Sequence, residues 1–236
     1  SLRMIRGWAR SISGSKNAVL PIMAAMILTT GENKISGVPQ VRDVTTMLHL
    51  LNDLSGRTGE LKEERIFFDA TDINNYEAPY ELVSTMRASC LVLGPLLARL
   101  GRAKVSLPGG CAIGTRPLDL HIRGLEAMGA KMRLERGYIY GSVKRLRGTR
   151  YYFDTVSVTG TANLMMAATL ADGETILENV AKEPEVVFLA DVLNRCGAKI
   201  EGHGTDLLVI QGVQSLKPID CHILPDRIET GTYMIA

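Results

Sequence analysis

The sequence lacks the features that would mark a membrane, secreted or nucleic-acid-binding protein. Its 27 Lys and Arg nearly balance its 25 Asp and Glu, and the net charge of +2 gives no reason to expect nucleic acid or a membrane surface as a partner. The longest apolar run, residues 18–28, is too short to span a bilayer. No stretch has the pattern of a secretory signal peptide. We therefore expect a cytoplasmic protein.

Cysteine motifs and nucleotide-binding loops are also missing. The four cysteines form no C-x-x-C pair and no Cys/His group with zinc spacing, which argues against a metal site. No G-x-x-x-x-G-K-[ST] loop is present and no G-x-G-x-x-G opens a helix, so neither a P-loop nor a dinucleotide cofactor is supported. The four histidines suggest no catalytic triad. We expect a protein that uses neither a metal ion nor a cofactor.

What the sequence does contain is a threefold internal repeat. Each copy has an almost wholly apolar run, a glycine, a short β-like stretch and an amphipathic run that closes at glycine. The apolar runs are "SGSKNAVLPIMAAMILTTG", "STMRASCLVLGPLLARLG" and "TGTANLMMAATLADG". The amphipathic runs, residues 47–56, 120–129 and 188–197, align without a gap.

This repeat predicts an α/β fold. A helix that is apolar all round should be buried on every side, whereas a helix with a polar face should touch water. Arg123, Glu126 and Lys131 are assigned to such a polar face. Alternating stretches such as residues 137–143 and 206–213 predict strands. We expect three similar units packed round shared buried helices, with small sheets outside.

The second copy alone carries an insertion, "PGGCAIGTR" at residues 108–116. Its glycines permit backbone angles that other residues resist, and loops at the rim of a rigid scaffold often carry function. Cys111 supplies a thiol, whose ordinary pKa of about 8.5 suits acid or nucleophilic chemistry. Arg116 adds a permanent charge that suits phosphate or carboxylate. The alternative is a plain turn with an incidental cysteine.

Polar groups also gather where the apolar runs begin. Lys16 and Asn17 lie where a helix N-terminus would favour an anion, although Lys16 could instead reach solvent and Asn17 could cap the helix. Arg87 needs a partner or water, and a surface ion pair would serve. Residues 157–161 could cradle a phosphate with hydroxyls and amides, or could simply cap the third buried helix.

Five stretches occur in an order that points to a known family. They are "SGSKNAVLP", "TMRASCLVLGPLLARLG", "VSLPGGCAIGTRPLDLHIRGLEAMGAK", "EPEVV" and "LPDRIETGTY". Together they resemble the UDP-N-acetylglucosamine 1-carboxyvinyltransferases of the enolpyruvyl transferase family. The resemblance implies an inside-out α/β barrel of three βαβαββ units. It also implies transfer of the enolpyruvyl group of phosphoenolpyruvate to the 3′-hydroxyl of UDP-N-acetylglucosamine, the first committed step of peptidoglycan synthesis.

The same resemblance assigns roles to residues of this chain. Cys111 matches the loop cysteine that fosfomycin alkylates, and we hypothesise that its thiol donates the proton to phosphoenolpyruvate. Lys16 and Arg116 match residues that hold phosphoenolpyruvate. Asn17 and Arg87 match residues near the sugar. The residues that match the uridine segment are Arg116, Pro117, Leu118, Asp119 and Leu120. Ser157, Val158 and Thr159 match the segment near the diphosphate.

The resemblance further implies a division of the chain. Residues 13–223 would form one enolpyruvyl transferase-like domain after an N-terminal segment, residues 1–12. Residues 224–236 would begin a second, largely missing domain of the same fold, so we expect residues 1–236 alone to be inactive.

Two departures and two alternatives accompany this interpretation. Residues 55–65 are irregular against the family pattern, and Thr155 stands where some members have lysine. A shikimate-pathway enolpyruvyl transferase would share the fold but would not need the cysteine loop. A non-catalytic fragment that binds a sugar nucleotide is the other alternative.

Overall fold

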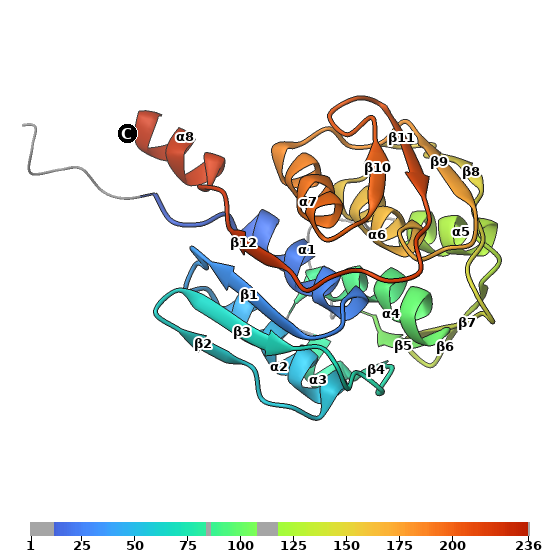
Figure 1. Ribbon diagram of the computed structural model, residues 1–236, viewed down its shortest axis with the longest axis horizontal. Coiled ribbons are helices and arrows are strands. Elements are labelled where there is room, and N and C mark those ends of the chain that lie inside the picture. The colour runs from blue at the N-terminus through green and yellow to red at the C-terminus, as the bar shows by residue number, and fades with distance from the viewer. Residues whose placement is uncertain (1–11, 84–85, 108–117, 236) are drawn as a thin grey trace, which may run out of the picture.

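The computed structural model describes residues 12–83, 86–107 and 118–235, without the side chains of residues 83, 87 and 89. In this part of the chain the helices form an inner and an outer set, and the strands form three small sheets (Figure 1).

The inner helices come from the apolar runs of the three repeats. They are α1 (Lys16–Ala25), which continues into η2 (Met26–Leu28); η3 (Arg87–Val92), which continues into α4 (Leu93–Leu100); and α6 (Val158–Ala168). Residues 18–25 of α1 and 160–168 of α6 are buried at every position. α6 packs against α1, η3 and α4. Helices without a polar face are covered on all sides, which confirms the prediction of shared buried helices.

The outer helices are amphipathic. They are α2 (Arg42–Ser55), α5 (Asp119–Ala127) and α7 (Pro184–Arg195), and a short helix, α3 (Tyr80–Val83), precedes η3. Arg123 and Glu126 of α5 are exposed, as predicted. The assignment of Lys131 to the same helix is wrong, because α5 ends before Gly129, whose φ of +92° is left-handed, and Lys131 starts strand β6 (Lys131–Glu135).

Each sheet has four strands and begins with a parallel pair. In spatial order the sheets are β12 (Asp220–His222), β1 (Glu32–Ser36), β3 (Arg65–Asp69) and β2 (Glu60–Lys62); β4 (Glu77–Ala78), β5 (Arg102–Ser106), β7 (Tyr138–Ser142) and β6; and β8 (Arg150–Tyr152), β9 (Glu174–Glu178), β11 (Leu207–Gln211) and β10 (Lys199–Glu201). The parallel pairs are β12–β1, β4–β5 and β8–β9, and the other neighbours are antiparallel.

The chain order shows three units of one plan, βαβαββ. The second and third units follow this order continuously along the chain. The first unit takes its leading strand from the far end of the chain, since β12 lies beside β1 with Cys221 opposite Ile35 (Figure 1). This pairing closes the ring of units, with the inner helices in the middle and the sheets outside.

A buried asparagine joins the strands of the first sheet. Asn33 in β1 is fully buried, and its Oδ1 accepts from the amide of Ile219 and from the hydroxyl of Thr29, both at 2.8 Å. Its Nδ2 donates to the carbonyl oxygens of Gly31 and Phe68, both at 3.2 Å. Both atoms of the side-chain amide are therefore satisfied, and the bond to Ile219 fastens the segment that leads into β12.

An arginine joins the first unit to the second. Arg99, in the last turn of α4, donates to the carbonyl oxygens of Ile27, Thr29, Ala70 and Thr71 at 2.5–3.1 Å. Partial burial lowers the pKa of its guanidinium. The side chain thus ties the end of η2 and the end of β3 to the inner helix beside them.

Residues 55–65, irregular by sequence, form the end of α2 and a hairpin. Strands β2 and β3 pair with Lys62 opposite Arg65, and the two residues between them, Glu63 and Glu64, have φ of 51° and 58°. Such a two-residue turn usually contains asparagine or glycine, so the sequence carried no hairpin signal there.

The last helix, α8 (Arg227–Ile235), has no buried residue. Arg227 at its start pairs with Glu185 of α7, with Nε 2.9 Å from Oε1, and Glu185 is itself only 3% exposed. The partition of the chain at residues 12 and 224 stays a prediction. None of the described helices is long and apolar enough to cross a membrane.

Candidate active site

Part of the predicted site lies outside the described residues. Cys111, Arg116 and Pro117 belong to the range that the structure does not describe. Arg87 starts η3, but its side chain is likewise outside the description. The roles predicted for these four residues therefore stay predictions. The other candidates lie in three described segments, at the starts of α1, α5 and α6.

At the start of α1, Lys16 is an ion-pair partner. Its Nζ lies 3.2 Å from Oδ2 of Asp43, in the first turn of α2, and the two side chains are 46% and 31% exposed. Ser15 occupies the N-cap position and Asn17 lies in the first turn of the helix, so the alternative in which Asn17 caps it is wrong. The carboxylate of Asp43, which sequence reasoning missed, holds the ammonium near the surface and leaves it open to an anion.

At the start of α5, two neighbouring residues differ in exposure. Leu118 occupies the N-cap position of the helix. Leu120 is buried, and its carbonyl oxygen accepts a hydrogen bond from Tyr151 Oη at 3.3 Å. Asp119 is exposed, and its Oδ2 lies 3.8 Å from Arg123, which also pairs with Asp154 at 3.5 Å. The polar surface here is an exposed, weakly paired group of charges.

At the start of α6, Ser157 is the N-cap. Its Oγ accepts from the amide of Gly160 at 3.1 Å, which confirms the capping interpretation. Val158 and Thr159 form the first turn, where helix amides have no partner within the helix. A capped helix start still presents amides and a partial positive charge to an anion.

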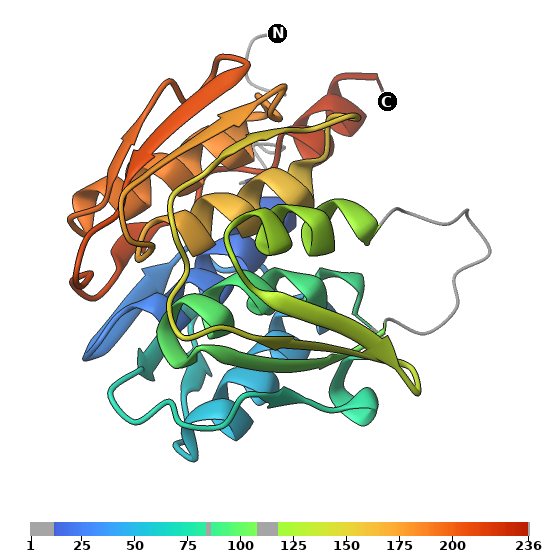
Figure 2. The same cartoon turned by 90° about the vertical axis from the view of Figure 1, so that its right-hand side faces the viewer.

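Two of these segments come together in space. α5 packs against α6, and Figure 2 shows both helices beginning on the same side of the molecule. The close packing depends on Gly124, because a Cβ there would lie 2.2 Å from Cδ1 of Leu164. The predicted uridine segment and the predicted diphosphate segment thus start neighbouring helices.

Sequence reasoning missed a buried polar link between these two helices. His121 of α5 is 2% exposed, and its Nδ1 lies 2.8 Å from Nδ2 of Asn163 in α6. Its Nε2 lies 3.4 Å from Oγ1 of Thr159. Burial lowers the pKa of His121 to about 4, while the charge of Asp119 acts weakly in the opposite direction. The sequence showed only a histidine in a predicted amphipathic helix.

The described cysteines offer no rival to Cys111. Burial raises the pKa of the thiols of Cys90, Cys196 and Cys221 to about 12, 11 and 12. Such groups stay protonated and inert near neutral pH. Among the described residues no group of histidine, cysteine and carboxylate side chains could hold a metal ion.

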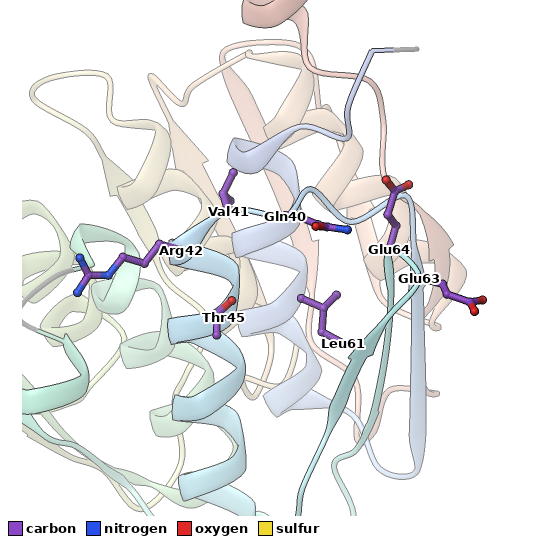
Figure 3. Close-up of a pocket in the computed structure, with 7 residues that line it drawn as sticks. All are labelled: Gln40, Val41, Arg42, Thr45, Leu61, Glu63 and Glu64. Carbon is purple, nitrogen blue, oxygen red and sulfur yellow. The ribbon is translucent and has the colours of Figure 1, made fainter. Parts of the chain in front are cut away.

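Two surface hollows are lined by none of these candidate residues. One, of about 380 Å³, lies between the start of α2 and the β2–β3 hairpin, where Arg42 points away from Glu63 and Glu64 (Figure 3). The other, of about 500 Å³, is lined by residues that include Gly14, Gln40 and His222. Neither contains a residue predicted to bind substrate.

Known protein sequences agree with the resemblance described above. Residues 6–236 match the family EPSP synthase (3-phosphoshikimate 1-carboxyvinyltransferase). A protein of Geobacter metallireducens named UDP-N-acetylglucosamine 1-carboxyvinyltransferase is 56% identical over 226 residues, which are 96% of this chain and 54% of that protein. One of the same name from Dichelobacter nodosus is 57% identical, with the same coverage. The chain spans about half the length of the curated relatives it matches.

Solved structures agree on the architecture. The enolpyruvyl transferase NikO from Streptomyces tendae has a TM-score of 0.83 at 22% identity, over 94% of this chain and 53% of that one. The EPSP synthase of Acinetobacter baumannii has a TM-score of 0.76 at 18% identity, over 96% and 52%. At such identities the likeness concerns the fold alone, and it confirms the predicted α/β arrangement of inner helices and outer sheets.

Proposed function

Since this chain belongs to the EPSP synthase (3-phosphoshikimate 1-carboxyvinyltransferase) family, we propose that the complete protein is an enolpyruvyl transferase that uses UDP-N-acetylglucosamine as acceptor. It moves the enolpyruvyl group of phosphoenolpyruvate to the 3′-hydroxyl of the sugar and releases phosphate. By the resemblance, the reaction is the first committed step of peptidoglycan synthesis and takes place in the cytoplasm.

One observation supports this acceptor above the others. The curated relatives named UDP-N-acetylglucosamine 1-carboxyvinyltransferase are 56–57% identical over nearly the whole chain. A solved EPSP synthase shares the fold at only 18% identity. The name of the family model alone would favour a shikimate phosphate, but the closer sequence likeness favours the sugar nucleotide.

The described geometry is consistent with a nucleotide-sugar site at the starts of α5 and α6. Two neighbouring helix N-termini concentrate partial positive charge, which suits the diphosphate. Asp119 and Leu120 at one start would contact the uridine, and Val158 and Thr159 at the other would present amides to the diphosphate. Thr155, exposed just before α6, adds no charge there.

Lys16 would supply a cation to phosphoenolpyruvate. Its ion pair with Asp43 is half exposed, so it contributes about 0–1 kcal/mol and gives way easily to a multiply charged anion. Asp43 then keeps the ammonium at the start of α1 before substrate arrives. Arg116 would provide the second cation.

The chemistry is an addition followed by an elimination. The sugar 3′-oxygen bonds to C2 of phosphoenolpyruvate, the 3′-hydroxyl proton goes to a base, and C3 gains a proton and becomes a methyl group. The C2–O bond to phosphate then breaks, C3 returns a proton, and the enol ether of the sugar is formed. The base that accepts the hydroxyl proton would come from the part of the relatives that this chain does not span.

Cys111 is the proton donor in this proposal. Nearby cations favour a thiolate, which is no acid, whereas the negative charges of bound phosphoenolpyruvate favour the neutral thiol. A thiol that is protonated only when substrate is bound suits general acid catalysis at C3. Fosfomycin would alkylate the same sulfur.

The test compares two acceptors. The complete protein is incubated with phosphoenolpyruvate and either UDP-N-acetylglucosamine or shikimate 3-phosphate, and the vinyl protons of the product are followed by NMR. We expect an enol ether with the sugar nucleotide alone. An enol ether formed only from shikimate 3-phosphate would support the other transferase. Sugar-nucleotide binding without any product would support a non-catalytic protein.

A further inference from the structure

The contact between α4, α5 and α6 contains a chain of hydrogen bonds whose directions are determined by its first member. The amide of Gly94 in α4 donates to Oδ1 of Asn163 at 2.7 Å. A backbone amide can only donate, so this atom of the side chain must be the oxygen. Nδ2 of Asn163 then faces Nδ1 of His121 at 2.8 Å and can only donate to it.

These hydrogen-bond directions determine which nitrogen of the His121 imidazole carries the proton. Nδ1 of His121 accepts a hydrogen bond and therefore carries no proton, so a neutral ring has its proton on Nε2. That proton points toward Oγ1 of Thr159, 3.4 Å away, which accepts it. Burial lowers the pKa of His121, which independently favours the neutral ring.

Helices α4, α5 and α6 pack closely around Asn163, which leaves its side chain little room to turn. A Cβ on Gly94 would lie 2.5 Å from both the backbone oxygen and Oδ1 of Asn163. On the other side, Gly124 brings α5 against Leu164. Asn163 is fully buried and cannot turn to water. The polar chain thus connects α4 through the middle of α6 to the first turns of both α5 and α6.

We propose that His121, in its neutral Nε2–H form, is a positioning residue that holds the start of α5 in register with the start of α6 and so aligns the two segments that bind the UDP moiety. The inference rests on the proposed function for its ligand. His121 directly follows Leu120, and Thr159 is itself one of the diphosphate candidates, so a shift of the ring moves both halves of the site. Lys16, at the start of α1, makes none of the hydrogen bonds of this link.

Three variants of the complete protein test the link atom by atom. His121→Asn keeps an acceptor near the Nδ1 position but loses the donor to Thr159. His121→Gln places an amide near the Nε2 position. Asn163→Asp keeps the acceptor for Gly94 but cannot donate to His121. His49→Asn, the same change at an exposed histidine of α2, is the matched control.

The expected result is a selective loss of sugar-nucleotide binding. His121→Asn and Asn163→Asp should raise the KM for UDP-N-acetylglucosamine about three- to tenfold, the equivalent of ~0.6–1.4 kcal/mol for one hydrogen bond. The KM for phosphoenolpyruvate should rise clearly less, because Lys16 lies outside the link. His121→Gln should restore part of the loss, and the control should have no effect. Nitrogen NMR of the wild type should show Nδ1 unprotonated and Nε2 protonated, and Asn163→Asp should move a proton to Nδ1.

Failure of the inference and failure of the proposed function are distinguishable. A wild type protonated on Nδ1 would overturn the inference, as would an unchanged KM for the sugar nucleotide in His121→Asn. Equal losses for both substrates, with unfolding at lower temperature, would show a merely structural role and overturn it as well. A wild type that transfers no enolpyruvyl group contradicts the proposed function, whatever the NMR tautomer.

Discussion

Loss of the Asn33 side chain should destabilise the protein strongly, because this amide joins β1 to the segment that enters β12. In Asn33→Ala the amide of Ile219 loses the partner described for it, whereas Phe68 stays opposite residue 33 in the antiparallel β1–β3 ladder. The hydroxyl of Thr29 is less affected, since it also lies 2.9 Å from the carbonyl oxygen of Met26. One buried amide left without a partner costs ~1–3 kcal/mol, and the lost side-chain bonds to Thr29 and Phe68 add ~0.5–1.5 kcal/mol.

The expected loss of unfolding free energy is therefore about 1.5–4.5 kcal/mol, a large share of the ~5–15 kcal/mol typical of a folded domain. Urea denaturation followed by circular dichroism measures it as a lower midpoint with an unchanged m-value. Asn74→Ala is the control, because Asn74 is exposed and its side chain makes no hydrogen bond among the described residues. A loss below about 1 kcal/mol for Asn33→Ala would refute this account of how the first unit is closed.

Three other predictions concern the site. In the complete protein, Cys111→Asp should keep substantial transfer activity and Cys111→Ser should lose most of it, since only the former retains an acid; equal losses would argue for an obligatory sulfur nucleophile. Lys16→Met should lower kcat/KM about a hundredfold. Asp43→Asn should lower it less than about fivefold, because the half-exposed ion pair only positions the ammonium. A larger loss of kcat/KM in Asp43→Asn than in Lys16→Met would contradict the role of Lys16. The pKa of His121 lies near 4 in the folded protein against 6.5 ordinarily, so the unfolded chain gains its proton first as the pH falls. Stability should thus drop between pH 6.5 and 4 by up to ~3 kcal/mol more in the wild type than in His121→Gln, and parallel denaturation curves for the two would show that the histidine is not buried neutral.

The inner helices could be predicted from the sequence because burial on all sides leaves a direct mark on composition. Residues 18–25 contain no polar side chain and residues 160–168 only Thr161 and Asn163, so a buried environment suits both helices. The starts of α5 and α6 followed from the repeat and the family motifs. The capping role of Ser157 followed from its residue type and its place before an apolar run.

Features made by distant residues left no such mark. β12 is three residues long, and its pairing with β1 joins positions such as Ile35 and Cys221 that only the closed ring of units brings together. The turn at Glu63 and Glu64 uses left-handed angles without the residues that usually favour them.

Polar partners across helices were hidden for the same reason. The pairing of Lys16 with Asp43 and of His121 with Asn163 depends on how α1 meets α2 and how α5 meets α6. In the sequence alone, His121 is an ordinary member of an amphipathic helix and Asn163 an ordinary member of an apolar one. Only their hydrogen-bond directions in the folded protein show that the pair has one orientation.

The most direct measurement of the central claim is phosphate release from phosphoenolpyruvate by the complete protein, with and without UDP-N-acetylglucosamine. We expect release only when the sugar nucleotide is present, in a one-to-one ratio to the sugar consumed. Release at the same rate without it, or release that responds to shikimate 3-phosphate instead, would contradict the account.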